Sequence, residues 1–331
     1  MPQPSYPFAS ARVKSRENAI MTREKALRLA GSDTPEEAMQ LLAEWGYAGA
    51  EDTAPERFEA CLTAELDAVY AFVEEITPDK AITDLFFLPN DYRNLKLILK
   101  QELAGGKGGK AASGPRGLLD VAAMQVAVQE KRYDGLPPEM ADALEELDRR
   151  FAVRQDASLI GLTLDRAYAA QVNRELADVR EGFVRAFFAL TFDFANLTAF
   201  LRLRRIGAGR DVLARAMLPG GNLPEELLKR AYEAPADEGF AMLARGPLQR
   251  ELAAAYDDYR STGSFALFHK VEADSLIRIV AANRQDMFSV APVLAYLVGK
   301  TREIEVVRMI LLAKLNGIAS ETLLGMLPNL L

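Results

Sequence analysis

The chain has 331 residues, of which 50% are hydrophobic and 26% are charged, so its composition favours a packed core and excludes general disorder. Its single cysteine, Cys61, excludes an internal disulfide framework, and its single histidine, His269, excludes histidine-clustered metal sites. The net charge of −7 argues against general nucleic-acid binding, and no continuous apolar run approaches the roughly 20 residues of a membrane span. We therefore expect a soluble, intracellular protein with little catalytic equipment.

Helix-favouring residues dominate the chain from its start, whereas alternating β-branched segments are nearly absent. A first helical stretch ends before Gly31, and a capping box restarts the helix, with Thr34 as cap, Pro35 at the first position and Glu37 three residues after the cap. The same kind of opening, a proline followed by a glutamate, recurs at Pro55-Glu56, Pro138-Glu139 and Pro224-Glu225. The prediction is an all-α fold.

Glycine- and proline-rich breaks interrupt the helices at 104–117, 207–209 and 219–224. The first break (AGGKGGKAASGPRG) suggests phosphate binding, because glycine amides and a lysine can surround a phosphate. It fails the P-loop spacing, since residue 104 is alanine where the first glycine is required and residue 111 is neither serine nor threonine. We interpret this segment as a solvated linker.

A repeat of about one hundred residues is the most informative feature. The segment 91–96 (DYRNLK) resembles 193–198 (DFANLT), and 303–308 (EIEVVR) is a weaker third copy. Each copy is followed at the same register by a glycine, which predicts left-handed helix C-caps at Gly105, Gly207 and Gly317. This period is too long for a solenoid and predicts three similar helical domains, with boundaries at 1–112, 113–215 and 216–331. It leaves open whether segment 1–30 packs on its own domain or on the last one.

The polar positions of the repeat are the candidate site residues, and they are Asp91, Asn94, Lys96, Asp193, Asn196, Glu303 and Arg308. We favour a structural role over catalysis, because the first two copies each offer a single acid without a nucleophile or histidine. Asp91 and Asp193 are expected to bond across a helix contact, with Lys100 and Arg202 as candidate partners. No catalytic residue, cofactor or metal site is predicted.

An arginine cluster ends the second copy at Arg202, Arg204 and Arg205. Such a cluster can bind phosphate or anionic lipid, or it can be a solvated helix end whose cations complement the helix dipole. The sequence favours the solvated helix end, and contact with a partner stays the alternative.

Segments spread over nearly the whole chain share a family pattern. They are 6–14 (YPFASARVK), the motifs that begin at Asp91 and Asp193, and 288–297 (FSVAPVLAYL) followed by Glu303, Arg308 and 314–317 (KLNG). In this order and spacing they resemble the C subunits of the V/A-type rotary ATPases, a family related to the d subunit of the eukaryotic vacuolar ATPase. The chain departs from the family at Val306, where an asparagine usually stands two residues before the arginine.

The resemblance implies three similar helical domains around a pseudo-threefold axis, forming a funnel. It implies a non-catalytic central-stalk component without a cofactor, whose partners are the proteolipid ring of the membrane sector and the central rotor shaft. Such a protein links ATP synthesis or hydrolysis to proton or sodium transport, and it associates with the cytoplasmic face of the membrane only through the complex. Arg202, Arg204 and Arg205 are then candidates for partner contacts at the funnel mouth.

Two other classes of protein compete with this interpretation. An all-helical interaction scaffold unrelated to ATPases would share the composition, but stacked short repeats should show a period near 34 or 40 residues, which the sequence lacks. A phosphate-dependent enzyme would use the 104–117 segment, and deleting 105–109 would then abolish its ligand binding.

Overall fold

Helices are the regular elements of this protein, as the sequence predicts. The structure is a computed structural model that describes residues 5–16, 20–105, 114–154, 156–318, 320–327 and 329–330, and no strand occurs within these ranges. The chain divides into two compact units, one formed by 1–83 with 258–331 and the other by 84–257. The three predicted domain boundaries stay predictions.

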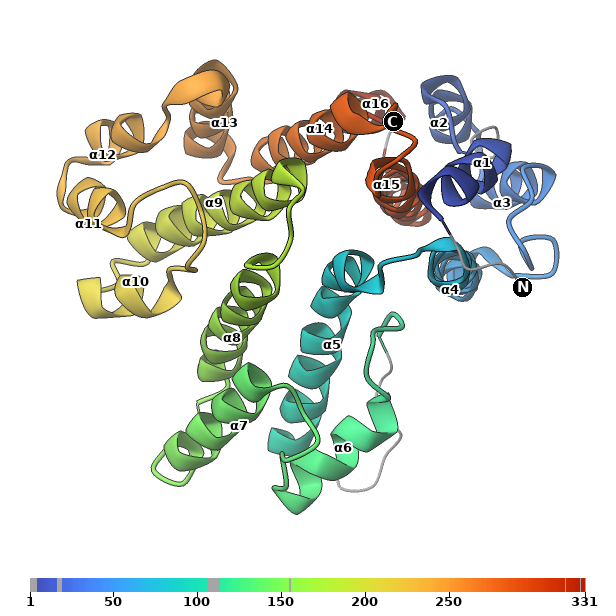
Figure 1. The fold of residues 1–331 in the computed structure, drawn as a ribbon. Helices are drawn as coiled ribbons and strands as arrows, with labels where there is room; N and C mark the ends of the chain where they lie inside the picture. Colours follow the sequence, from blue (N-terminus) through green and yellow to red (C-terminus); the bar gives the residue numbers. More distant parts are fainter. Residues whose placement is uncertain are drawn as a thin grey trace. The chain divides into compact units, whose positions relative to one another are not determined.

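Unit 1 is built around its longest helix. Its elements are α1 (Tyr6–Arg16), α2 (Arg23–Ala30), α3 (Pro35–Glu44), the 3-10 turn η2 (Pro55–Arg57), α4 (Phe58–Ile76), α14 (Ala266–Asn283), α15 (Ala291–Leu315) and α16 (Ser320–Met326). Helices α1, α2, α4 and α14 pack against α15 (Figure 1). Because partners surround the first half of α15, residues on all faces of its first turns are buried, and even the charged residues Lys300 and Glu303 lie in the interior.

Unit 2 contains the long helices α8 and α9, most of the long helix α5, and a set of shorter helices. Its elements are α6 (Val121–Glu130), α7 (Pro138–Phe151), α8 (Ser158–Leu176), α9 (Gly182–Arg205), α10 (Arg210–Ala216), α11 (Glu225–Glu233), α12 (Ala236–Leu243) and the turn η3 (Gly246–Leu248). Helices α5 (Lys80–Leu103) and α13 (Gln249–Thr262) lie mostly in unit 2 and extend into unit 1. Helix α7 packs along α8, and α10 and α11 pack on α9 (Figure 1).

Local sequence signals place the helix ends as predicted. The Thr34 hydroxyl accepts the Glu37 amide at 3.1 Å and opens α3, while the Glu37 carboxylate accepts the Asp33 amide at 2.7 Å. The long helices α5, α9 and α15 are followed by glycines with left-handed backbone, at φ of 78°, 65° and 65° for Gly105, Gly207 and Gly317. The predicted left-handed C-caps are therefore confirmed.

One described helix, α9, is long and apolar enough to cross a membrane by length and composition. The sequence shows no continuous apolar run of that length, because Arg185 and Asp193 interrupt it. More than half of its most apolar stretch, 56%, is buried within the protein. The core of a helical protein accounts for this composition, and α9 is only weak evidence for a span.

Candidate functional site: three carboxylate anchors

The first repeat motif fixes a loop to a helix. Asp91 and Asn94 lie on α5, both fully buried, and they face the loop 114–119 that leads into α6. The Asp91 carboxylate accepts the amides of Leu118 at 3.1 Å and Leu119 at 3.0 Å. The Asn94 side chain accepts the Gly114 amide at 2.9 Å and donates to the Pro115 carbonyl at 3.0 Å. The buried polar side chains thus have hydrogen-bond partners, and so do the backbone groups of the loop.

The second motif repeats this arrangement on α9. Asp193 accepts the Leu223 amide at 2.8 Å and the Asn222 side-chain amide at 2.9 Å. The Asn196 side chain accepts the amide of Leu218 at 2.7 Å and donates to its carbonyl at 3.0 Å. The loop held in this way leads into α11, as the first leads into α6.

Glycine is required where the carboxylate approaches the loop most closely. A Cβ atom on Gly117 would overlap Asp91 Oδ1, and a Cβ atom on Gly221 would overlap Asp193 Oδ1. Each Asp therefore lies directly against the loop backbone, which any larger residue would push away.

The third motif anchors a segment from the other end of the chain. Glu303 on α15 is fully buried and accepts the Met21 amide at 2.7 Å and the Tyr47 hydroxyl at 2.5 Å. Lys300 donates to Glu303 at 2.6 Å and to Glu65 on α4 at 2.7 Å. Helices α1 and α2 of the N-terminal segment pack on α15 of the last copy, and they also contact α4 and α3, respectively, so the segment packs on both of the predicted domains.

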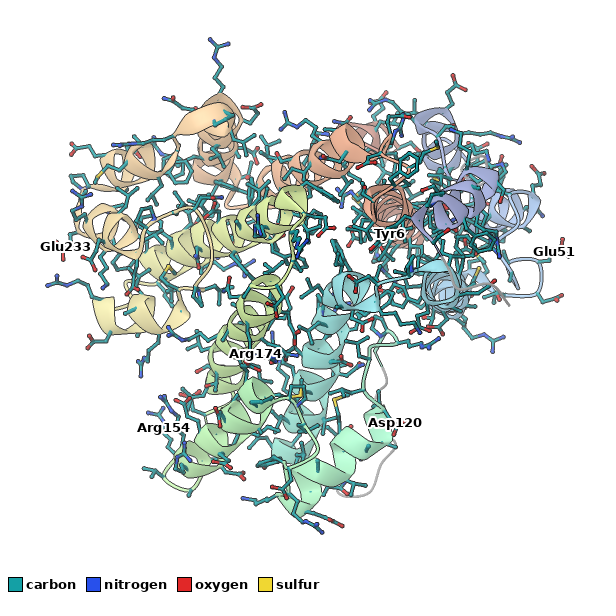
Figure 2. The ribbon with its side chains drawn as sticks, viewed as in Figure 1. Tyr6, Glu51, Asp120, Arg154, Arg174 and Glu233 are labelled. Carbon is teal, nitrogen blue, oxygen red and sulfur yellow. The ribbon has the colours of Figure 1, made fainter. Side chains whose placement is uncertain are left out.

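All three carboxylates obey one positional rule. Each accepts the amide of the residue immediately before a helix N-cap: Leu119 before Asp120, Leu223 before Pro224, and Met21 before Thr22. Figure 2 shows Asp120 at the start of α6. Each motif therefore fixes the position of a helix start, and we call the three motifs anchor 1, anchor 2 and anchor 3 in chain order of their carboxylates.

Anchor 3 is split between the two ends of the chain. Helix α16 and helix α10 each have 7 residues and begin three residues after the cap glycine. Helix α16 packs on α14, α15 and α2, as α10 packs on α8, α9 and α11. Helix α2 therefore packs on α15 and α16 in the same way as α11 packs on α9 and α10. The loop that is continuous in anchor 2 is replaced in anchor 3 by two chain ends.

The split explains why the third copy lacks its asparagine. Asn94 and Asn196 bond to the backbone at the start of an intact loop. In anchor 3 the backbone amide bonded to the carboxylate belongs to Met21, and the residue equivalent to the asparagines, Val306, is a buried apolar residue at 1% exposure. The Leu327 carbonyl, at the register of Leu218, accepts the Lys270 ammonium at 3.0 Å instead, and an apolar residue packs at position 306.

Burial controls the electrostatics of the anchors. Burial raises the pKa of Asp91 to about 6, and the amides of Leu119 and Leu118 only partly oppose this. Burial by itself lowers the pKa of Lys300, but the carboxylates of Glu303 and Glu65 outweigh it, so that its pKa is raised. Burial and the Glu303 charge raise the pKa of Tyr47, which keeps its hydroxyl a donor. Lys300 is consequently a buried, charged ammonium between two carboxylates.

The remaining repeat cations link neighbouring long helices. Lys96 on α5 pairs with Asp165 on α8, and Arg308 on α15 pairs with Glu59 on α4 at 2.8 Å. Lys96 and Arg308 occupy the same register of the repeat, so an ion pair from a long helix to a neighbouring helix occurs at this register in both units. In the second copy this register holds Thr198, whose hydroxyl bonds to its own helix at the Phe194 carbonyl.

The candidate partners of the aspartates were wrong. Lys100 lies on the same helix as Asp91, and Arg202 on the same helix as Asp193, about 13 Å further along the axis. That separation prevents an ion pair within the helix, and loop amides take the place of the cations.

Arg204 lies inside unit 2 rather than at a free surface. Its guanidinium donates to the carbonyls of Ala231, at 2.9 Å, and Ala234, and it lies 5.7 Å from the Phe200 ring centroid. It therefore complements the C-terminal end of α11. Arg202 and Arg205 are exposed, and their assignment as partner contacts stays a prediction.

The anchored loops carry a signal that the sequence analysis missed. The segments 114–119 (GPRGLL) and 218–223 (LPGGNL) share a proline, a glycine and a leucine at a constant offset of 104 residues. The chain end 326–330 (MLPNL) echoes 217–223 (MLPGGNL). Aligning these breaks with each other, instead of treating them only as helix stops, would have found the loops. Most of the predicted linker, 106–113, lies outside the described residues.

The fold and the anchors define the class of this protein, an all-α protein of repeated helix pairs with buried loop anchors. The sequence model of the ATP synthase (C/AC39) subunit family matches residues 9–326, so the chain belongs to this family. It is 24% identical over 347 aligned positions to the C subunit of the A-type ATP synthase of Methanocaldococcus jannaschii, covering 98% of this chain and 86% of the relative. It is 25% identical to the protein of the same name from Methanothermobacter thermautotrophicus, covering 93% of this chain and 84% of that one.

Proposed function

We propose that this chain is the non-catalytic central-stalk component of a V/A-type rotary ATPase. It connects the proteolipid ring of the membrane sector to the central rotor shaft, so that ATP synthesis or hydrolysis is coupled to proton or sodium transport. The observation that carries the proposal is the family match over residues 9–326. The protein acts at the cytoplasmic face of the membrane and is held there by the complex.

The anchors support a mechanical role. A part that passes torque must resist deformation, and a packed helical interior does so because few voids allow it to rearrange. The three anchors hold helix starts by hydrogen bonds of 2.7–3.0 Å between buried carboxylates and backbone amides. Within the described residues, their geometry positions backbone and brings together no nucleophile and base. The pseudo-threefold funnel implied by the family resemblance stays a prediction.

The test is native mass spectrometry of the tagged protein from gently solubilised membranes of its own host. We expect it to carry a rotor-shaft protein and several copies of a small proteolipid per tagged chain. Recovery alone, or with unrelated soluble partners, while the ATPase in the same membranes is intact, would overturn the proposal and favour a helical scaffold.

A second test addresses the exposed arginines of α9. We propose that Arg202 and Arg205 contact a partner protein of the complex, so R202E/R205E should lower the recovery of the complex or the coupling of ATP hydrolysis to transport. Arg204 is left unchanged because its bonds to α11 maintain the fold. Arg215, an exposed arginine on α10, provides the matched control R215E. Unchanged assembly and coupling in R202E/R205E would dismiss this contact.

A further inference from the structure

A groove on unit 1 lies between α3 and the loop 45–57 that follows it. Its volume is about 470 Å³, and its floor includes Met39 and Ala50, which are buried at 3% and 2% exposure. Figure 2 shows Glu51 on this loop. An apolar floor thus lies between acidic walls, and we call this site the acidic groove. The exposed polar side chains that line it are Glu36, Gln40, Glu44 and Glu51.

No lysine or arginine is among the described residues that line the acidic groove. Glu36 and Glu51 form no ion pair within the part of the chain that the structure describes. Glu44 lies 3.6 Å from Arg28 on α2, but the two side chains are 60% and 62% exposed, so solvent screens this pair. The stretch 29–56 contains seven acidic residues and no lysine or arginine, although the chain has 40 of these cations. The groove therefore concentrates negative potential that its own lining does not cancel.

Two hollows in unit 2 differ from the acidic groove in the charges of their lining. The hollow between α7, α8 and α10 has a volume of about 640 Å³, and Glu146 and Arg150 in its lining pair at 2.5 Å. The hollow beside α7 has a volume of about 620 Å³, and Lys131 and Asp148 in its lining pair at 3.1 Å. Opposite charges within these two linings neutralise each other. The described lining of the acidic groove has one sign of charge, so a cation from another molecule is needed to neutralise it.

The loop wall of the acidic groove is fixed within unit 1. The Tyr47 hydroxyl donates to Glu303 of anchor 3 at 2.5 Å, and the Tyr47 amide donates to the Leu42 carbonyl on α3 at 3.0 Å. The Thr53 hydroxyl donates to the Gly49 carbonyl at 2.5 Å. These bonds hold the loop against α3 in the free protein, so a ligand does not have to order it.

The spacing of the carboxylates suits cations on flexible side chains. Glu36 and Glu44 lie eight residues apart on α3, which separates them by about 12 Å along the helix axis. An extended segment rises about 3.3 Å per residue, so cations three or four residues apart on it span this distance. Within the described residues, no group of three or more metal-ligating side chains could hold a metal ion. Lysine or arginine side chains on an extended segment therefore match the groove better than a metal ion does.

We propose that the acidic groove binds an extended segment of a partner protein that carries lysine or arginine side chains. The cations pair with the carboxylates of Glu36, Glu44 and Glu51, and their methylene stems pack on the floor at Met39 and Ala50. Charge complementarity of this kind speeds association and selects basic partners over acidic ones. The inference does not depend on the proposed function, because it rests on a groove of the isolated chain.

The experiment measures the fluorescence anisotropy of a labelled peptide added to the full-length protein. The probe is a glycine–serine peptide with lysine at every fourth position, and the control peptide has glutamine in place of lysine. We expect the lysine peptide to bind with an affinity that falls as salt is added, and the glutamine peptide not to bind. Lack of binding by the lysine peptide, or equal binding of the two peptides, overturns the proposal.

Removal of charge from the groove should weaken binding more than removal of charge elsewhere. The variant E36Q/E51Q should bind the lysine peptide about tenfold more weakly, because two carboxylates no longer attract its cations. The matched control E102Q/E238Q removes the same charge from two exposed glutamates in unit 2 and should change the affinity less than about twofold. Thermal unfolding checks that each variant folds. Equal loss of affinity in both variants would indicate general attraction to an acidic protein and would overturn the proposal.

A variant of unchanged charge tests the groove itself. Ala43 lines the groove, so the larger side chain of A43L occupies it and should weaken binding severalfold. The matched control A170L alters the hollow between α7, α8 and α10 and should bind as the wild type does. If A43L also binds as the wild type does, the peptide does not enter the groove and the proposal is wrong.

A free polyamine is another source of the same positive charge. If spermine binds the wild type but the lysine peptide does not, the groove is a polyamine site and the docking proposal is wrong. If the lysine peptide binds and E36Q/E51Q weakens its binding selectively, the proposal stands whether or not spermine competes. These assays use the isolated chain and the test of function uses the complex, so failure of one proposal is distinguishable from failure of the other.

Discussion

Anchors 1 and 2 in unit 2 and anchor 3 in unit 1 each contain a buried carboxylate, but the groups that bond to it differ. In unit 2 a continuous loop supplies enough backbone groups to satisfy an Asp and an Asn, and no cation among the described residues is bonded to either aspartate. In unit 1 the loop is divided between two chain ends, and the carboxylate is satisfied by one amide, a tyrosine and Lys300. In anchor 3 a buried ion pair with Lys300 is therefore added to the hydrogen bonds that Glu303 accepts from Met21 and Tyr47.

The difference between anchor 3 and the other two anchors is visible in the sequence at position 300. Lys300 stands three residues before Glu303, whereas the equivalent residues before Asp91 and Asp193 are Leu88 and Leu190. A buried lysine is tolerated only where paired charges offset its desolvation. Anchor 3 meets this condition because Glu65 and Glu303 both contact the ammonium.

The largest expected effect comes from removing that cation. Lys300→Met leaves two carboxylates in the interior without their shared partner and should lower the free energy of unfolding by about 3–5 kcal/mol. The matched control is Leu88→Met at the same register of anchor 1, which should cost less than about 1.5 kcal/mol. Urea unfolding measures both, and equal costs would remove the distinction between the anchors.

Titration of Asp91 is the next test. Its pKa, raised to about 6 by burial, means that the folded state binds the proton more tightly than the unfolded state. Its contribution to stability is therefore largest below about pH 4, falls as the pH rises to about 6, and is constant above that, a change of up to about 3 kcal/mol. The difference in stability between wild type and Asp91→Asn, measured at pH 5 and 7.5, should shrink at the higher pH. A constant difference would contradict the prediction.

Contact between the carboxylate and the loop predicts a steric effect. Gly117→Ala places a Cβ atom against Asp91 Oδ1 and should cost about 1–3 kcal/mol through displacement of the loop. Gly135→Ala is the control, because a Cβ there meets no atom within 4 Å. In the background Asp91→Ala the cost of Gly117→Ala should fall, which a double-mutant cycle measures. Full additivity would argue against the contact.

The asparagine of the continuous anchors is expected to have a smaller effect. Asn196→Val leaves the Leu218 amide without its acceptor and should cost about 1–2 kcal/mol. The reverse change in anchor 3, Val306→Asn, should also destabilise, because it buries an amide beside a loop that is interrupted. If Val306→Asn stabilised the protein, the explanation of the third copy from its split loop would be wrong.

The smallest effects belong to the cross-helix ion pairs that the two units share. The Lys96 and Asp165 side chains are 25% and 50% exposed, and those of Arg308 and Glu59 are 34% and 52% exposed, so solvent screens both pairs. Lys96→Ala and Arg308→Ala should each cost less than about 1 kcal/mol, and less still in high salt. A decrease of several kcal/mol in the free energy of unfolding would indicate that these ion pairs contribute as much to stability as the anchors do.

The sequence alone determined the all-α class, several helix starts, the three cap glycines and the register of the repeat. These follow from local rules, since a cap or a left-handed glycine acts on the few residues around it. The same register located Asp91, Asn94, Asp193, Asn196 and Glu303 as polar positions of the repeat, and the structure shows that they are buried.

Only the tertiary structure decided what these residues bind. The partner of Asp91 lies 28 residues away along the chain and that of Glu303 lies 282 residues away, and in both cases the partner is a backbone amide. Every residue except proline offers such an amide, so no side-chain pattern identifies the bonded one. The pairing is selected by which loop the packed helices bring against the carboxylate, and for anchor 3 that loop comes from the opposite end of the chain.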